Sequence, residues 1–139
     1  MSDLWLRYQP EWHATKKQPA IGNGSLVSKR AETPDGLVFL HMALTVGSTT
    51  KMGRGQYQFS LPVPAAPHIP GSLLGSGAAE ILGWSYPIVV VQVDESRWAC
   101  QGDGFWVGHK SPQRWHEGDE LRVLINYMKA STLHQPATV

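Results

Sequence analysis

The chain of 139 residues alternates apolar and polar positions in several short runs, a pattern that predicts β-strands. In residues 37–46 (LVFLHMALTV), one side of the run is wholly apolar and carries Val38, Leu40, Met42, Leu44 and Val46. Residues 119–130 (DELRVLINYMKA) repeat the pattern with Leu121, Val123, Ile125 and Tyr127. Because successive side chains of a strand point to opposite faces, each run is expected to bury one face.

Three further runs complete the strand pattern. Residues 56–63 (QYQFSLPV) alternate up to Pro62, which stops the strand because proline donates no ladder hydrogen bond. Residues 86–95 (YPIVVVQVDE) are apolar on both faces, as a covered central strand would be. Residues 97–101 and 104–110 are predicted to form a hairpin around Gly102-Asp103-Gly104, since Asp-Gly favours a two-residue turn.

These runs predict an all-β fold, an antiparallel β-sandwich of jelly-roll type with about seven strands. A single domain is expected over residues 1–130, followed by a flexible C-terminal tail at 131–139. The Pro- and Gly-rich residues 62–77 are interpreted as a long surface loop. Helical composition occurs in residues 75–84 (GSGAAEILGW), which would support about two turns of helix at most.

Composition and charge narrow the classes of partner. The net charge is +1, and the twelve basic and eleven acidic residues are spread along the chain, which argues against nucleic acid or an anionic membrane. The aliphatic run at residues 88–91 is too short for membrane insertion, and the first residues lack a secretory signal pattern. We therefore expect a soluble protein made in a cytoplasm. A charged fraction of 17% and six Trp are typical of a chain that commits surface to partners.

The residue types that carry chemistry form no catalytic or metal-binding motif. The six His show no ligand spacing, and Cys100, the one cysteine, is expected in the core. Acidic residues gather at strand ends beside turns, where carboxylates face water: Asp94, Glu95, Glu117, Asp119 and Glu120. We therefore predict no catalytic residue, no cofactor and no metal.

The tryptophans divide into two groups. Trp98 and Trp115 lie within strand-like or ordered contexts and are predicted to fill the core. Trp84 and Trp106 flank turns and are the candidate ligand-binding residues. An exposed Trp serves either as a platform for a sugar ring or as part of a protein interface, and the sequence leaves both open.

The tripeptide Gly22-Asn23-Gly24 predicts a tight turn in which Asn23-Gly24 supplies the left-handed conformations. It belongs to the first of three stretches: residues 8–26 (YQPEWHATKKQPAIGNGSL), 43–65 (ALTVGSTTKMGRGQYQFSLPVPA) and 111–130 (SPQRWHEGDELRVLINYMKA). Together they resemble a β-rich domain, usually C-terminal, of minor tail and tail-fibre proteins from phages that infect actinobacteria. The matching positions are turn and core residues, interpreted as a scaffold: Gly22, Asn23, Gly24, Gly47, Thr49, Thr50, Phe59, Pro62, Trp115 and Asp119.

The resemblance implies a virion structural protein, made in the host cytoplasm, that forms a homotrimer and builds a tail appendage or host-binding surface without catalysis. Its partners would be other virion proteins, with a host cell-wall glycan as the candidate ligand of Trp84 and Trp106. Because the chain begins directly at this domain, we expect it to attach by its own surface to the tail or the capsid. Two alternatives stay open: a capsid decoration protein, and a carbohydrate-binding or glycan-cleaving module.

Overall fold

The computed structural model describes residues 5–66 and 72–130, and every regular element within them is a β-strand. The strands are β1 (Leu6–Tyr8), β2 (Trp12–Ala14), β3 (Ser25–Glu32), β4 (Leu37–Thr45), β5 (Tyr57–Ser60), β6 (Leu73–Ile81), β7 (Trp84–Asp94), β8 (Arg97–Gly102), β9 (Phe105–Trp106) and β10 (Glu120–Met128). Neighbouring strands pair antiparallel throughout. The all-β, antiparallel prediction is confirmed, whereas the predicted tail at 131–139 lies outside the described residues.

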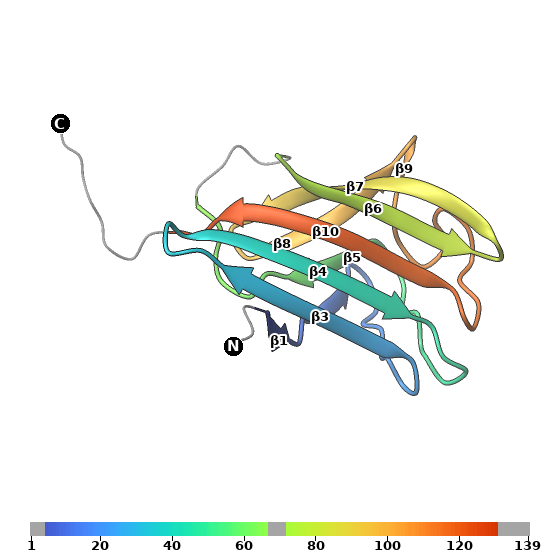
Figure 1. Cartoon of the computed structure of the whole chain (residues 1–139). Helices are drawn as coiled ribbons and strands as arrows, with labels where there is room; N and C mark the ends of the chain where they lie inside the picture. The colour runs from blue at the N-terminus through green and yellow to red at the C-terminus, as the bar shows by residue number, and fades with distance from the viewer. Residues whose placement is uncertain (1–4, 67–71, 131–139) are drawn as a thin grey trace.

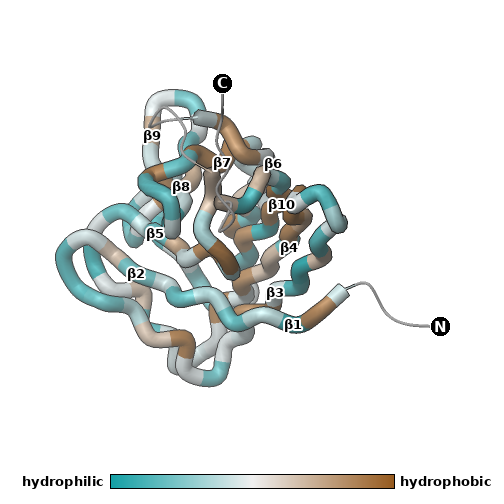
Figure 2. The backbone as a smooth tube through the Cα atoms, turned by 90° about the vertical axis from the view of Figure 1, so that its left-hand side faces the viewer, coloured by the Kyte–Doolittle hydropathy of each residue, from teal (hydrophilic) through white to brown (hydrophobic). Residues whose placement is uncertain are grey.

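The strands form one continuous sheet in the order β1-β3-β4-β10-β6-β7-β8-β5-β2, with β9 paired to β8. Figure 1 shows the long strands β3, β4, β10 and β6 side by side. In Figure 2 the strands follow one another around a common interior, so the sheet is strongly curled. A jelly-roll sandwich of two separate sheets is not confirmed by this pairing.

Ser60, the last residue of β5, fastens the two edges of the curled sheet. The edge strands β1 and β2 are consecutive in sequence and are joined by residues 9–11. The hydroxyl of Tyr8 donates to the carbonyl oxygen of Ser60. The N–H of Glu11 donates to Ser60 Oγ at 2.7 Å, and the N–H of Ser60 donates to the carbonyl oxygen of Glu11 at 3.1 Å. These bonds hold the curl closed at its edges.

The apolar faces predicted for β4 and β10 lie in the interior. The two strands pair in register, with Leu40 opposite Ile125 and Leu44 opposite Leu121, and all four side chains are buried. Burial of four aliphatic side chains of this size removes enough apolar surface from water to stabilise the pairing by several kcal/mol, at about 1.5–3 kcal/mol each.

The opposite wall of the interior is aromatic. Phe59 on β5 stacks on Trp98 on β8, with ring centroids 4.6 Å apart, and Trp12 on β2 lies parallel to Phe59 at 6.5 Å. Trp98 and Cys100 are fully buried and Trp115 is 8% exposed, in agreement with their predicted place in the core. The predicted hairpin is also confirmed, since Gly102 pairs with Phe105 across the turn.

Residues 75–81 are extended and residues 82–83 form the turn into β7, so the helical composition of this segment does not produce a helix. Residues 75–81 form most of β6, which pairs with β10 on one side and β7 on the other. Gly75 and Gly77 lie so close to β10 that a Cβ on either would overlap a carbonyl oxygen of that strand. The small residues that suggested a helix are there because two backbones approach closely. The predicted loop at 62–77 is correspondingly shorter, because β6 begins at Leu73.

The turn at residues 21–24 forms as predicted, but its left-handed residue is Gly22, with φ of 58°. The N–H of Gly24 donates to the carbonyl oxygen of Ile21 at 2.9 Å and closes the turn. Neither Asn23 nor Gly24 has a positive φ. The assignment of the left-handed conformation to Asn23-Gly24 is therefore wrong, and Asn23 contributes through its side chain instead.

Candidate ligand-binding site

Asn23 joins two of the three scaffold stretches at the end of the sheet where β3 begins and β4 ends. Its Oδ1 accepts a hydrogen bond from the N–H of Thr49 at 2.9 Å. Its Nδ2 donates to Ser48 Oγ at 2.8 Å, and its own N–H donates to Thr49 Oγ1 at 2.8 Å. The turn that precedes β3 is thereby fixed to the turn that follows β4.

Thr50 and two glycines complete this junction. Thr50 Oγ1 accepts from the N–H of Gly47 at 2.8 Å and donates to the carbonyl oxygen of Ile21 at 2.6 Å. A Cβ on Gly24 would overlap the carbonyl oxygen of Thr45, and one on Gly47 would overlap the backbone of residues 23–24. The glycines are therefore required because the two turns touch.

Asp119, from the third stretch, secures the same end of the sheet. Its carboxylate is 6% exposed and accepts from the N–H of Leu82 at 3.0 Å and from the N–H of His116 at 2.6 Å. Its carbonyl oxygen accepts from the N–H of Val46 at 2.9 Å. The scaffold positions thus hold loops and core together. Of the others, Phe59 and Trp115 are buried and Pro62 is half-buried after β5.

Trp106 lines a hollow of about 460 Å³ formed by residues 15–16, 55–56, 104–106 and 108–111, here called the Trp106 pocket. Backbone hydrogen bonds assemble it from three parts of the chain. The N–H of His109 donates to the carbonyl oxygen of Gly55 at 3.1 Å, and the N–H of Thr15 donates to that of Gln56 at 3.1 Å. The pocket therefore exists because β2, β5 and the β8–β9 hairpin are neighbours in the curled sheet.

Two ring nitrogens of this pocket are unused hydrogen-bond donors. His109 Nδ1 accepts from the N–H of Gly55 at 2.9 Å, so a neutral ring carries its proton on Nε2. Within residues 5–66 and 72–130, neither His109 Nε2 nor the indole N–H of Trp106 has a hydrogen-bond partner. A ligand with acceptor oxygens would satisfy both.

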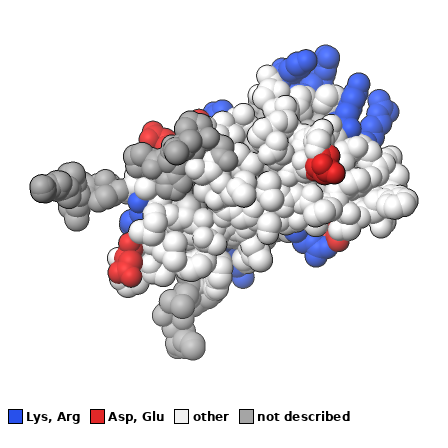
Figure 3. Space-filling view, turned by 90° about the horizontal axis from the view of Figure 1, so that it is seen from above, with Lys and Arg blue, Asp and Glu red and all other residues white. Residues whose placement is uncertain are grey.

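Basic side chains surround the Trp106 pocket although they are spread along the sequence. Lys16 and Lys110 line it, and backbone pairing of Lys17 with Arg54 and of Ala20 with Lys51 adds further cations nearby. In the described part of the chain, none of the basic members of this group has an ion-pair partner. Figure 3 shows several Lys and Arg close together at one corner of the face in view, with other Lys and Arg at its remaining edges.

Trp84, the second candidate residue, lies elsewhere. It is 69% exposed and lines a separate hollow of about 560 Å³, which shares no residue with the Trp106 pocket. This hollow is bordered by the acidic residues Glu80, Asp119 and Glu120. The structure therefore does not combine Trp84 and Trp106 into one binding face.

Three of the five acidic candidates, Asp94, Asp119 and Glu120, make structural contacts. Glu80 and Glu120 both pair with Arg122, the latter at 3.2 Å. Asp94 accepts from the N–H of Ser96 at 2.8 Å in the β7–β8 turn. Among the residues that the structure describes, no three His, Cys, Asp or Glu side chains are grouped so as to hold a metal ion.

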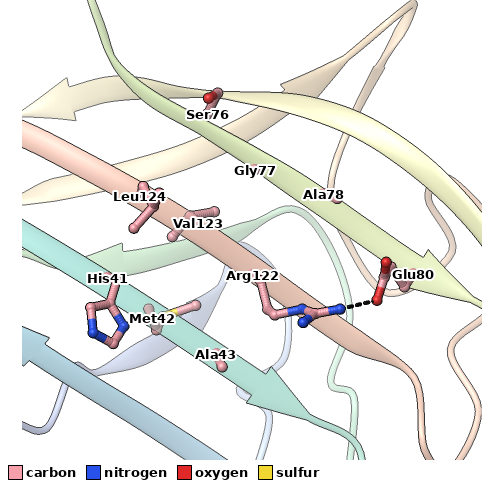
Figure 4. Close-up of a pocket in the computed structure, with 10 residues that line it drawn as sticks. All are labelled: His41, Met42, Ala43, Ser76, Gly77, Ala78, Glu80, Arg122, Val123 and Leu124. Carbon is pink, nitrogen blue, oxygen red and sulfur yellow. Dashed lines mark hydrogen bonds and ion pairs between the residues drawn. The ribbon is translucent and has the colours of Figure 1, made fainter.

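A third hollow, of about 460 Å³, lies on the outer face of the sheet, which is the side of β4, β10 and β6 turned away from the core. Figure 4 shows Ala43, Ser76 and Ala78 beside the longer side chains of Arg122 and Leu124. The small side chains create the depression. Large apolar side chains are exposed on the same face: Phe39 at 37%, Leu124 at 67% and Met128 at 44%.

Sequence reasoning identified Trp106 but missed its polar neighbours Lys16, His109 and Lys110. A weak signal was present, since basic residues stand next to turn glycines in GRG (53–55) and GHK (108–110). That signal does not reveal that the two turns meet. Their contact depends on the pairing of Gln56 with Gly108, which no local pattern encodes.

Comparison with known proteins gives one informative similarity. The chain is 29% identical, over 137 aligned residues, to the Mu-like prophage FluMu defective tail fiber protein of Haemophilus influenzae. The alignment takes in 86% of this chain and 20% of that protein, so the chain spans about a fifth of the relative's length. No family model and no solved structure matches the chain. The similarity agrees with a phage tail protein, and membership of the actinobacterial phage family stays a prediction. No helix in the described residues is long and apolar enough to cross a membrane.

Proposed function

We propose that this protein is a tail-associated structural component of a phage virion, of minor tail or fibre-head type. The observation that carries the proposal is the similarity to a prophage tail fibre protein over 86% of the chain. Since that similarity covers a fifth of the relative, it concerns one domain and not the relative's whole architecture. The proposed location is the virion, where the domain builds an appendage or a host-binding surface.

The arrangement of the scaffold residues supports this assignment. The three stretches that resemble phage tail domains are far apart in sequence, yet Asn23, Thr49 and Asp119 secure turns at one end of the sheet. Because these residues secure turns at the same end of the sheet, they are expected to occur together in a sequence that folds this way. The motif therefore describes a folded scaffold, and function lies in the surfaces that the scaffold presents.

We further propose that the domain assembles as a homotrimer through the outer face of the sheet. Phe39, Leu124 and Met128 place exposed apolar side chains on neighbouring strands there. Contiguous exposed apolar surface is typical of protein interfaces.

A non-catalytic role fits the acidic residues, because the carboxylates of Glu80, Asp119 and Glu120 are held by hydrogen bonds or ion pairs.

Location on the particle is the direct test. Gold-labelled antibody against the purified protein is expected to mark the tail of particles of a phage that encodes it, and antibody absorbed with the protein serves as control. Label on the head would contradict the tail assignment and favour a capsid decoration protein. Absence from purified particles would contradict a virion role of either kind. Release of reducing ends from host cell-wall glycan by the protein would contradict the non-catalytic part.

A further inference from the structure

We propose that the Trp106 pocket binds an anionic saccharide, with a sugar ring on the indole of Trp106 and acidic groups of the sugar on Lys16 and Lys110. This goes beyond the proposed virion role and does not depend on where the domain is located. The pocket has three properties that suit such a ligand: an aromatic surface held in place, cations without an ion-pair partner and several hydrogen-bond donors.

The aromatic surface is positioned by its neighbours. Phe105 packs edge-on against Tyr86, with ring centroids 6.3 Å apart at 85°, and Tyr86 Oη accepts from Gln113 Nε2 at 2.8 Å. This contact anchors β9, the two-residue strand that carries Trp106. Trp106 is half-buried and its indole N–H is unpaired within the described residues. A flat apolar ring with a free donor at its edge suits the face of a sugar and its hydroxyl oxygens.

The cations supply selectivity for negative charge. Lys16 and Lys110 are exposed, and Lys17, Lys51 and Arg54 lie on the adjoining turns. The chain as a whole carries only +1, and the residues that line the pocket include two lysines and no Asp or Glu. Elsewhere, Arg122 forms ion pairs with Glu80 and Glu120, and Lys129 and Arg30 form ion pairs with Glu32. A locally unbalanced positive patch raises the concentration and on-rate of anionic ligands.

Several hydrogen-bond donors line the pocket. The two lysines, His109 Nε2 and the Trp106 indole can all donate, which favours a ligand with several acceptor oxygens. A carboxylate- or phosphate-bearing sugar does so. The pocket volume of about 460 Å³ is small, and Trp106, the one indole that lines it, is half-buried. Single-stranded nucleic acid is held instead along a groove with several stacking platforms, which favours the saccharide.

Binding is tested by calorimetry on the intact protein with five probes: oligogalacturonate, a phosphorylated oligosaccharide, neutral maltohexaose, inorganic polyphosphate and oligothymidylate. We expect at least one of the two acidic saccharides to bind, about tenfold or more tightly than maltohexaose, with affinity falling as salt rises. The first two arms separate carboxylate from phosphate recognition. Failure of both acidic saccharides to bind overturns the proposal.

Matched variants locate the site. Trp106→Ala and the double variant Lys16→Gln/Lys110→Gln should each weaken acidic saccharide binding by about tenfold or more, whereas Trp106→Phe should retain most of it. Trp84→Ala and Lys29→Gln change the same residue types outside the pocket and should have no effect. Thermal unfolding of each variant checks that the fold is kept.

Two further outcomes would overturn the proposal. If polyphosphate binds with the same affinity as the acidic saccharides, and Trp106→Ala changes neither affinity, the basic residues form a general anion-binding patch. If oligothymidylate binds more tightly than both acidic saccharides and loses binding with Trp106→Ala, the pocket recognises nucleic acid. Because purified protein is used, failure here leaves the tail location untouched, and a negative result on particles leaves this site untouched.

Discussion

At the scale of single residues, Asn23 shows how one side chain connects distant parts of the sequence. Its amide group uses both ends, accepting from the N–H of Thr49 and donating to Ser48. Sequence alone indicates a turn here, because Gly and Asn are common in turns. The partners of the amide are 25 and 26 residues away and could not be read from the local pattern.

Substitution Asn23→Ala is expected to lower the free energy of unfolding by about 1–2 kcal/mol, because two hydrogen bonds between turns are lost. Asn23→Asp keeps the acceptor for Thr49 and should lose less. Urea unfolding followed by tryptophan fluorescence measures both. Ser48→Ala removes one of the two hydrogen bonds, so its loss in the free energy of unfolding should be smaller than that of Asn23→Ala. Equal losses for the two variants would contradict the bridging role of Asn23.

Buried tyrosines and the buried thiol predict alkaline sensitivity. Burial raises the pKa of Tyr8 to about 12, and burial also raises the pKa values of Tyr57, Tyr127 and Cys100 above their usual range. The folded state therefore favours the neutral forms. Stability is fully present below the unfolded pKa values, near 9.0 for Cys and 10.0 for Tyr, and is lost as pH rises toward the folded ones.

We expect the urea midpoint to be flat between about pH 7 and 8.5 and to fall progressively from about pH 9 upward. In Tyr8→Phe the fall above pH 10 should be shallower than in the wild type, because one titrating group is gone. The midpoints are measured at matched ionic strength. A midpoint that rises above pH 9, or a Tyr8→Phe slope equal to that of the wild type, would contradict this assignment.

At the scale of elements, β6 is where local composition and tertiary structure disagree most. Its glycines and alanines reduce strand propensity, yet β10 and β7 enclose it from both sides. Close approach of backbones excludes a Cβ at Gly75 and Gly77. The same small side chains leave the depression on the outer face of the sheet.

Gly77→Ala should therefore destabilise the protein by about 1–3 kcal/mol through overpacking against β10. Ser76→Ala, one residue away and exposed, should change stability by no more than about 0.5 kcal/mol. Thermal unfolding and amide hydrogen exchange of β10 provide the measurement. Equal stability of the two variants would show that β6 can move away from β10 without cost.

The strands that could be predicted from sequence are those with strict alternation. Each residue on the inward face of β4 could be predicted, because one face of the strand packs on the core and the other is exposed to solvent. The same holds for β10. In contrast, β6 and the Trp106 pocket depend on which strands become neighbours, and strand order is set by long-range packing that alternation does not record. For this reason the sequence pattern identified Trp106 as a candidate but did not identify Lys16 and Lys110 as its neighbours.

At the scale of the whole molecule, the outer face predicts self-association. Leu124→Lys should convert the proposed homotrimer into monomer, because a charge would enter an apolar interface. Leu82→Lys is a matched control: Leu82 is 59% exposed, close to the 67% of Leu124, but lies in the β6–β7 turn. Sedimentation velocity measures both. A wild-type monomer, or a trimer unaffected by Leu124→Lys, would contradict this interface.

The position of β10 in the sheet has a consequence for how the chain must be made. It is the last strand of the described residues, at 120–128, yet it lies between β4 and β6. As the chain leaves the ribosome, β4 and β6 have no strand between them until residue 128 has emerged. Long-range pairing of this kind folds slowly and leaves strand edges open to other chains while it is incomplete. The sheet therefore cannot be completed before β10 has been synthesised, and nascent chains that stop before β10 are the species most exposed to aggregation.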